Sequence, residues 1–149
     1  MNESKFVYVT YIRATPDNIW EALTTPEFQK KFWFGGWQES QWKPGDSWTL
    51  HMPEIGTADA GEILEAERPR KIVIKWRNEF MPELKAAGFS RCTYEIERAG
   101  EVTKLTVVHE SGTQAFIDAV SKGWPMILSS LKSLLETGNP LPRSEQMKK

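Results

Sequence analysis

The sequence predicts an α+β fold in which a seven-stranded, curved antiparallel sheet packs against a long C-terminal helix. Three features of the chain predict it. A β-branched and aromatic segment comes first, successive hairpin patterns fill the middle, and an apolar stripe at helical spacing closes the chain. Two short helices are expected after the first strand. The predicted order is therefore one strand, two helices, six strands and one helix.

The first elements are indicated by composition and by helix start signals. Residues 6–12, FVYVTYI, predict the opening strand because β-branched and aromatic side chains favour extended backbone. Thr15 and Thr25 are N-cap residues, and each is followed by a proline at the first helical position. Two short helices should therefore start there. The second is expected to end at Gly35 and Gly36.

The middle of the chain predicts a meander of hairpins, because strand-like runs alternate with turn residues. The segment between the second and third hairpins, residues 78–89, is interrupted by Pro82 and Gly88 and predicts a loop with room for one helical turn. The paired runs are 37–42 with 47–52 around KPGD, 57–67 with 71–76 around RPR, and 90–97 with 104–110 around RAGEVT.

The last helix is expected to begin near Thr113 and to end at Gly138, a residue that readily takes the left-handed cap conformation. A helix of about 24 residues spans about 36 Å. Strands of about six to eight residues reach only about 20 to 26 Å. The helix should therefore cross the sheet diagonally.

Pro125 lies inside this apolar stripe and has no N–H for the carbonyl of Ser121, so a bend is expected there, eased by Gly123. The stripe keeps its phase across the proline, which favours one bent helix. A fresh helix that starts at Pro125 is the alternative.

Length and charge restrict the class of protein. A chain of 149 residues with 40% hydrophobic residues fits a single domain over 1–149, with a core over 6–138 and a frayed tail over 139–149. Its 19 Lys and Arg balance 20 Asp and Glu, which argues against nucleic acid or an anionic membrane surface as a partner. Its apolar runs are too short for membrane insertion. MNESKF lacks the features of a signal peptide, and the single cysteine suits a reducing compartment, so we expect a cytoplasmic protein.

The order of motifs resembles a known family. The segments IRATPDNIWEALTTPEFQKKFW, WKPGDSWTL, GEILEAERPRKIVIKW, KLTVVHE and GWPMILSSLKSLLETG together resemble the activator of heat-shock-protein ATPase homologues. These form a branch of the START-like (SRPBCC), birch-allergen-like helix-grip superfamily. The resemblance covers about residues 6–138. It implies a sheet curled around the C-terminal helix with a hydrophobic cavity between them, and relatives that bind lipids, sterols or other apolar molecules.

Strand and helix periodicity assigns a set of side chains to the space between sheet and helix. Seven tryptophans in the chain are more than a core of this size needs. They line a ligand cavity in one interpretation, and they fill the space as a solid core in the other. The candidate lining residues are Trp33, Trp48, Leu50, Ile74, Trp76, Tyr94, Val107, His109, Phe116, Val120, Trp124 and Leu128.

Few residues suggest catalysis. His109 is the one inward-facing histidine, and a lone buried histidine is more often a satisfied structural group than a general base. Cys92 sits on the apolar face of its strand and is expected to be inert. No metal site or cofactor is expected, because two histidines and one cysteine lie on different strands. In the run FWFGGW, residues 32–37, Phe34 and Trp37 flank the Gly pair. They form a hydrophobic gate at a cavity mouth, or a patch that docks a partner subunit, or the run is a helix stop with anchoring aromatics.

The cavity that the resemblance implies favours the binding of a small hydrophobic ligand, lipid-like or aromatic, and the absence of a convergent acid/base pair disfavours catalysis. An interaction module that forms a homodimer or contacts a chaperone ATPase is one alternative. A small-molecule enzyme that uses His109, with Tyr94 beside it, is the other.

Overall fold

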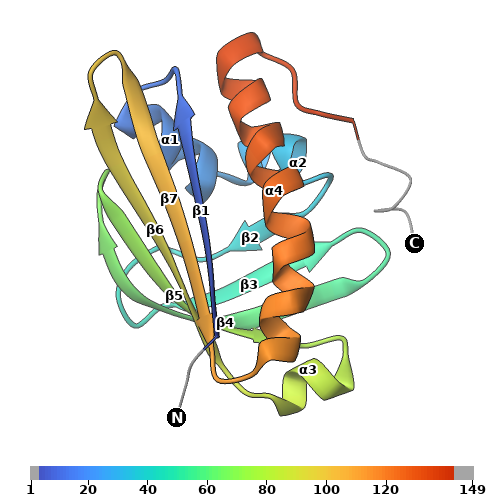
Figure 1. Cartoon of the computed structure of the whole chain (residues 1–149). Helices are drawn as coiled ribbons and strands as arrows, with labels where there is room; N and C mark the ends of the chain where they lie inside the picture. Colours follow the sequence, from blue (N-terminus) through green and yellow to red (C-terminus); the bar gives the residue numbers. More distant parts are fainter. Residues whose placement is uncertain (1–3, 143–149) are drawn as a thin grey trace.

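The structure is a computed structural model, and it describes residues 4–142. Its elements follow the predicted order of one strand, two helices, six strands and a long helix, with one short helix added between the fifth and sixth strands (Figure 1). They are β1 (Ser4–Ile12), α1 (Pro16–Thr24), α2 (Pro26–Phe32), β2 (Trp37–Glu39), β3 (Ser47–Met52), β4 (Gly56–Glu67), β5 (Lys71–Asn78), α3 (Pro82–Ala86), β6 (Ser90–Ala99), β7 (Val102–Ser111) and α4 (Gln114–Thr137).

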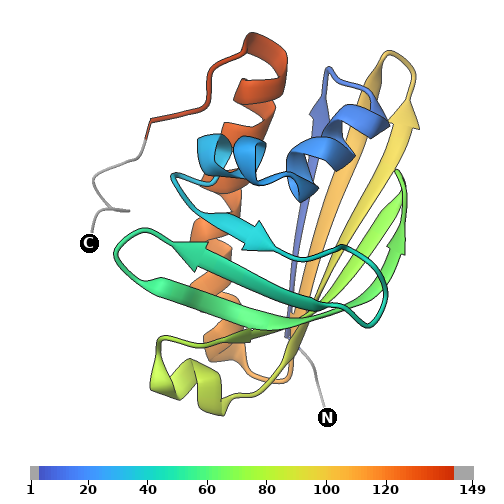
Figure 2. The same ribbon diagram turned by 180° about the vertical axis from the view of Figure 1, so that it is seen from behind.

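The strands form one seven-stranded antiparallel sheet in the order β1-β7-β6-β5-β4-β3-β2. Strands β2 to β7 are a meander, and β1 joins its far side by pairing with β7, from Ser4 opposite Ser111 to Ile12 opposite Thr103. The sheet twists so strongly that β3 and β4 run across the direction of β1 and β7 (Figure 1). Seen from behind, α1 and α2 lie above β2, and α2 packs against α4 (Figure 2). The predicted fold class is confirmed.

The two short helices begin where their caps predict. Thr15 Oγ1 accepts a hydrogen bond from the Asn18 N–H at 3.1 Å, whereas Thr25 caps α2 without a side-chain bond. Helix α2 ends at Phe32, earlier than expected, because Phe34 already has a positive φ of 54°. Gly35 follows at φ 93°, so the chain leaves the helix through left-handed backbone that glycine tolerates best.

Strand β2 is shorter than the predicted run 37–42. Trp42 has a φ of 59°, and its N–H bonds to Ser40 Oγ at 3.0 Å, so the backbone turns there instead of continuing the ladder. The 78–89 segment contains the expected single helical turn, α3.

Helix α4 is one continuous helix that contains Pro125, so the prediction of a single helix is confirmed and the alternative of a fresh start at Pro125 is wrong. Gly138 caps its end at φ 89°, with its N–H on the Leu134 carbonyl at 2.9 Å. The C-terminal half is tied to β1, since Lys132 Nζ donates to the Tyr11 carbonyl at 2.6 Å. The helix lies across the hollow side of the sheet (Figure 1).

Only the first part of the expected frayed tail, residues 139–142, is described. It turns back on α4, where the Leu141 N–H donates to Ser130 Oγ at 3.1 Å. The rest of that tail, 143–149, lies outside the described residues. Within residues 4–142, no helix combines the length and the hydropathy needed to cross a bilayer.

Candidate functional site

A pocket of about 230 Å³ lies between the N-terminal half of α4 and strands β3 to β5. Two of its residues, Ile55 and Phe80, are each 45% exposed, so the pocket opens to solvent between them. The pocket is lined by Trp33, Leu50, Met52, Ile55, Ala58, Asp59, Trp76, Phe80, Val120, Gly123, Trp124 and Ile127.

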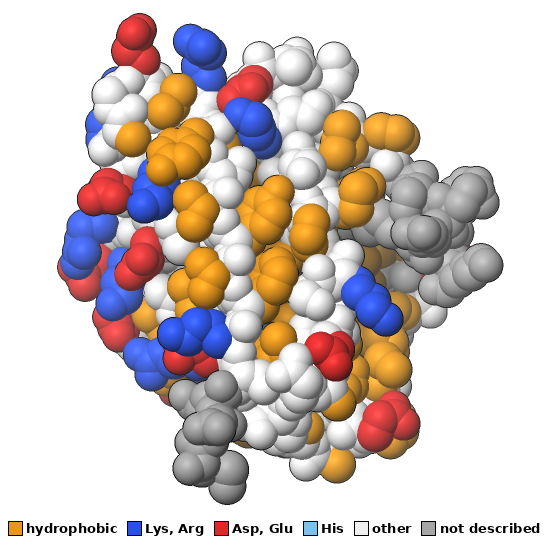
Figure 3. Space-filling view, in the orientation of Figure 1, with side chains coloured by type: hydrophobic (Ala, Val, Ile, Leu, Met, Phe, Trp, Pro, Cys, Tyr) orange, Lys and Arg blue, Asp and Glu red, His pale blue; other side chains and the backbone are white. Residues whose placement is uncertain are grey.

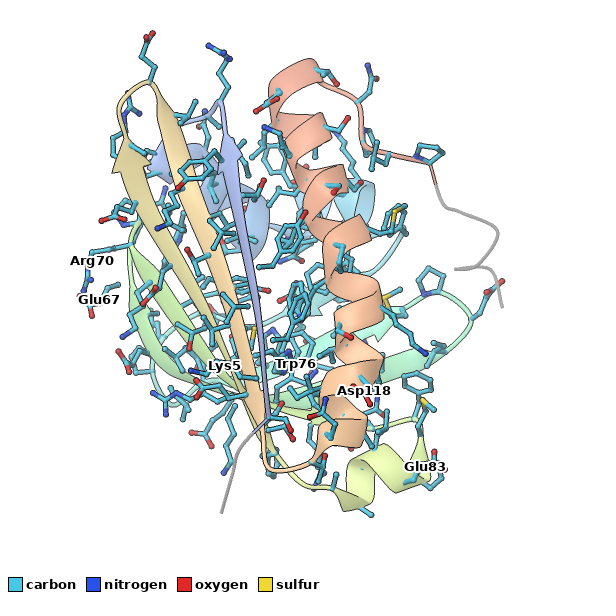
Figure 4. All side chains as sticks on the ribbon, in the orientation of Figure 1. Lys5, Glu67, Arg70, Trp76, Glu83 and Asp118 are labelled. Atoms are coloured by element: carbon cyan, nitrogen blue, oxygen red, sulfur yellow. The ribbon has the colours of Figure 1, made fainter. Side chains whose placement is uncertain are left out.

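The sheet side of the pocket is built around a glycine. Gly61 on β4 lies opposite Trp48 on β3 and opposite Trp76 on β5, and the two indole rings meet with their centroids 4.4 Å apart. A Cβ on Gly61 would collide with the Lys75 carbonyl. The missing side chain therefore lets the strands approach and lets the indoles close over them. Figure 4 shows Trp76 between the sheet and α4, while the labelled Glu67, Arg70 and Glu83 lie at the periphery.

Trp124 of α4 is held by a buried hydrogen-bond chain. Its indole N–H donates to His109 Nδ1 at 3.1 Å, and His109 Nε2 lies 2.9 Å from Ser90 Oγ. Ser90 gives its own proton to the Trp76 carbonyl at 2.9 Å. These partners assign the neutral Nε2–H tautomer to His109, because Nδ1 must accept and Nε2 must donate.

His109 is therefore a satisfied structural group. It is fully buried, and this burial lowers its pKa from 6.5 to about 3. Both ring nitrogens are engaged within the protein, so neither is available to a substrate in this arrangement. The structure supports the structural interpretation of His109 over its role as a general base.

Asp59 is the polar feature of the pocket, and sequence reasoning missed it. It lies between Leu50 and Asn78 in the sheet register and is 8% exposed. Burial raises its pKa from 3.8 to about 7, the side chains of Trp76 and Asn78 oppose that shift, and the charge of Glu79 adds to it. Asn78 Nδ2 donates to Asp59 Oδ1 at 3.3 Å. The Trp76 N–H lowers the pKa of Asp59, although its position does not satisfy the geometry of a hydrogen bond to any described residue.

The structure divides the predicted lining set. Trp33, Leu50, Trp76, Val120 and Trp124 line the pocket. The other candidates are buried side chains outside the pocket lining: Trp48, Ile74, Tyr94, Val107, His109, Phe116 and Leu128. Sequence reasoning missed the pocket residues Met52, Ile55, Ala58, Asp59, Phe80, Gly123 and Ile127. Alternation along β4 could have found Asp59, since it shares a face with Gly61 and Ile63.

Trp48 illustrates the solid-core interpretation. Its indole N–H donates to Gln38 Oε1 at 2.9 Å, and the Gln38 N–H donates to Gln29 Oε1 at 2.7 Å. Gln29 in turn donates to the Leu23 carbonyl at 2.7 Å, so a buried polar chain links α1, α2, β2 and β3. These hydrogen bonds fix the Trp48 indole in the core, next to Trp76 and outside the pocket lining.

The run FWFGGW behaves mainly as a helix stop. Trp33 is the member that lines the pocket, where its ring meets Trp124 edge-on at 5.6 Å. Phe34 and Trp37 do not line it, and Trp37 lies against the His51 ring at 4.5 Å. The two residues expected to form a gate, Phe34 and Trp37, are therefore not part of the pocket lining.

The described residues contain no group of His, Cys, Asp and Glu arranged to hold a metal ion. Cys92 is fully buried, and burial raises the pKa of its thiol, which disfavours the reactive thiolate. The Tyr94 hydroxyl is also buried, with no hydrogen-bond partner among residues 4–142.

A family model described as "Activator of Hsp90 ATPase homolog 1-like protein" matches residues 13–136. None of the curated proteins compared with the chain matches it.

Solved structures of similar fold have low identity to the chain. CalU16 from Micromonospora echinospora is 21% identical with a TM-score of 0.74, covering 90% of this chain and 77% of that one. The Aha1 dimer from Colwellia psychrerythraea is 20% identical with a TM-score of 0.73, covering 91% and 98%. An HSP90 activator from Plasmodium falciparum is 21% identical with a TM-score of 0.72, covering 88% and 95%. At these identities the likeness shows the fold alone.

Proposed function

The chain belongs to the family of Activator of Hsp90 ATPase homolog 1-like proteins, whose model spans residues 13–136, and from this premise we propose that it binds a small, largely apolar molecule. The ligand lies in the pocket between α4 and strands β3 to β5. The observation that carries the proposal is the pocket itself, about 230 Å³ of space walled by aromatic and aliphatic side chains and open beside Ile55 and Phe80.

The chemistry of the walls supports an apolar guest. Pockets that bind small molecules are mostly hydrophobic, with a few polar groups that orient the ligand. Here the indoles of Trp33, Trp76 and Trp124 supply apolar surface, and Asp59 supplies the polar group. The Trp76 side chain also lowers the pKa of Asp59, so this wall favours a carboxylate beside the guest.

Gly123 allows the pocket to be blocked without disturbing its walls. It lies on α4 beside the pocket, and a Cβ added to it would meet only Ile127 Cδ1, at 3.9 Å. Gly123→Leu should occupy the space and weaken the binding of a neutral apolar fluorophore such as N-phenylnaphthylamine by at least about tenfold. Gly123→Ala is the matched control, since it adds only a methyl group and leaves most of the pocket volume free.

Fluorescence titration of both variants, with circular dichroism to verify folding, decides the question. Equal affinity for the fluorophore in wild type and folded Gly123→Leu would contradict the proposal. Mass spectrometry of small molecules released from freshly purified protein would then identify what the pocket carries.

Self-association through β1 is a second candidate function. β1 is an edge strand of the sheet. Its outward-facing residues Val7, Val9 and Tyr11 are 52%, 44% and 49% exposed. Figure 3 shows apolar side chains gathered along this part of the surface. A strand of this kind can pair with its own copy about a two-fold axis, and the Colwellia psychrerythraea relative is described as a dimer.

Light scattering on purified protein tests this second candidate. Val9→Lys should halve the mass of a dimer, because it places a charge at the centre of the pairing strand. Leu64→Lys, at a 37% exposed position within the sheet, is the control that should leave the mass unchanged. A wild-type chain that is monomeric at all concentrations contradicts this candidate.

A further inference from the structure

Asp59 is the one ionisable side chain among the described residues that line the pocket. An apolar guest alone needs no carboxyl group there, and burying one with incomplete pairing costs free energy. The position of Asp59 therefore points to a feature of the ligand that compensates this cost.

The protein leaves much of the hydrogen-bonding capacity of Asp59 unused. An ionised carboxylate has about four acceptor positions. Among the described residues, Asn78 donates to it over a long 3.3 Å, and the Trp76 N–H lowers its pKa from outside hydrogen-bond geometry. The negative charge of Glu79 repels an ionised Asp59 and so raises its pKa. Glu79 itself forms ion pairs with Arg77 and Lys85. Within residues 4–142 no Lys or Arg forms an ion pair with Asp59.

The rest of the wall is suited to positive charge. Trp33 and Trp76 both contact Trp124, with ring centroids 5.6 Å and 5.8 Å apart, and Phe80 stands at the opening. Aromatic faces attract a cation, and indole attracts it most strongly. A site that combines several such rings with one carboxylate is complementary to an ammonium group joined to an apolar body.

We infer that the ligand of this pocket is an organic cation, an apolar molecule that carries a protonated amine or a quaternary ammonium group. Its charged head lies beside Asp59, and its apolar part lies among the rings of Trp33, Trp76 and Trp124. This inference rests on the proposed function and adds the chemical class of the ligand.

A neutral guest would use Asp59 in the opposite protonation state. Protonated Asp59 could donate to a hydroxyl or carbonyl group, whereas a cation needs the carboxylate. Because burial raises the pKa of Asp59 to about 7, both states are accessible near neutral pH. Affinity for a cation should therefore increase as the pH rises through this value, and affinity for a neutral acceptor should decrease.

Three probes with one apolar body separate these cases: phenylbutylamine, phenylbutanol and phenylbutyrate. We expect the amine to bind wild-type protein at about pH 8 at least about tenfold more tightly than the alcohol, and the anion to bind weakest. At about pH 5 the advantage of the amine should shrink, since Asp59 is then protonated. Asp59→Asn, which keeps the shape of the side chain, should abolish the advantage while the alcohol still binds. Calorimetry measures all three affinities.

The outcomes distinguish the two levels of the proposal. If the alcohol binds as tightly as the amine at about pH 8, the ligand class is wrong and the pocket still binds apolar molecules. If none of the three binds and Gly123→Leu does not change fluorophore binding, the proposed function fails as well. The pH dependence is measured on the unmodified protein, so the test does not depend on the folding of Asp59→Asn.

Discussion

The indole N–H of Trp124 donates to Nδ1 of His109 across 3.1 Å and so joins α4 to β7 beneath the pocket. The bond gives a reason for the large side chain one residue before Pro125. The proline removes a backbone hydrogen bond from the helix at this level, and Trp124 attaches the same turn to the sheet.

Trp124→Phe should lower the free energy of unfolding by about 1 to 3 kcal/mol, because it leaves a buried acceptor on His109 without its donor. Urea denaturation measures the loss. The control is Trp37→Phe, at a half-buried indole that rests on the His51 ring. The hydrogen bond is unimportant for stability if both variants unfold at the same urea concentration.

Asp59→Asn should stabilise the free protein at alkaline pH. The pKa of Asp59 is raised by burial from 3.8 to about 7, so the folded state holds a proton that the unfolded state has lost. Stability from this group is complete below the unfolded pKa and disappears as the pH rises through the folded pKa. The variant should gain a few kcal/mol over wild type at about pH 8 and nothing below about pH 4. A gain that does not change with pH would show that Asp59 does not titrate as described.

His109 should contribute the opposite dependence. Burial lowers its pKa from 6.5 to about 3, so between these values the unfolded state takes up a proton that the folded state refuses. Its contribution is complete above the unfolded pKa and is lost as the pH falls towards the folded pKa. Asp59 obscures this trend in the wild type, so the comparison is made in an Asp59→Asn background.

In that background, adding His109→Gln should reduce the slope of unfolding free energy against pH between about pH 6.5 and pH 3, because glutamine does not titrate. Urea denaturation at several pH values gives the two slopes. Identical slopes would mean that His109 is protonated equally in both states.

Gly61→Ala should destabilise the fold by about 3 kcal/mol, because a Cβ there collides with the backbone of β5 beneath the Trp48 and Trp76 rings. Thermal unfolding measures the effect. Gly112→Ala is the control, since a Cβ at that position has no heavy atom within 4 Å and should be tolerated. A Gly61→Ala variant as stable as wild type would show that the two strands can separate without cost.

The sequence was informative where local chemistry decides structure. N-cap residues and glycine caps located α1 and α4, and turn residues located the hairpins of the meander. The phase of the apolar stripe correctly favoured one helix through Pro125. The short β2 could not be predicted, because its end depends on the positive φ of Trp42, a residue type that rarely adopts it.

The pocket was harder to predict because periodicity assigns a side chain to a face and says nothing of the space left on that face. Trp48 and Trp124 face the same interior, yet one is held in the core and the other borders the pocket. The mouth residues Ile55 and Phe80 lie beyond the regular strands, where alternation gives no guidance. Asp59 was within reach, since Gly61 and Ile63 continue the same inward face.

The pairing of β1 with β7 has a consequence for biosynthesis. Ser4 lies opposite Ser111, so β7, the one strand that pairs with β1 within residues 4–142, leaves the ribosome after all of the chain between them. Until then β1, which carries the apolar residues Val7, Val9 and Tyr11, has no hydrogen-bonded neighbouring strand. Such distant pairing slows folding and leaves nascent chains prone to aggregation. The sheet is therefore completed late in translation.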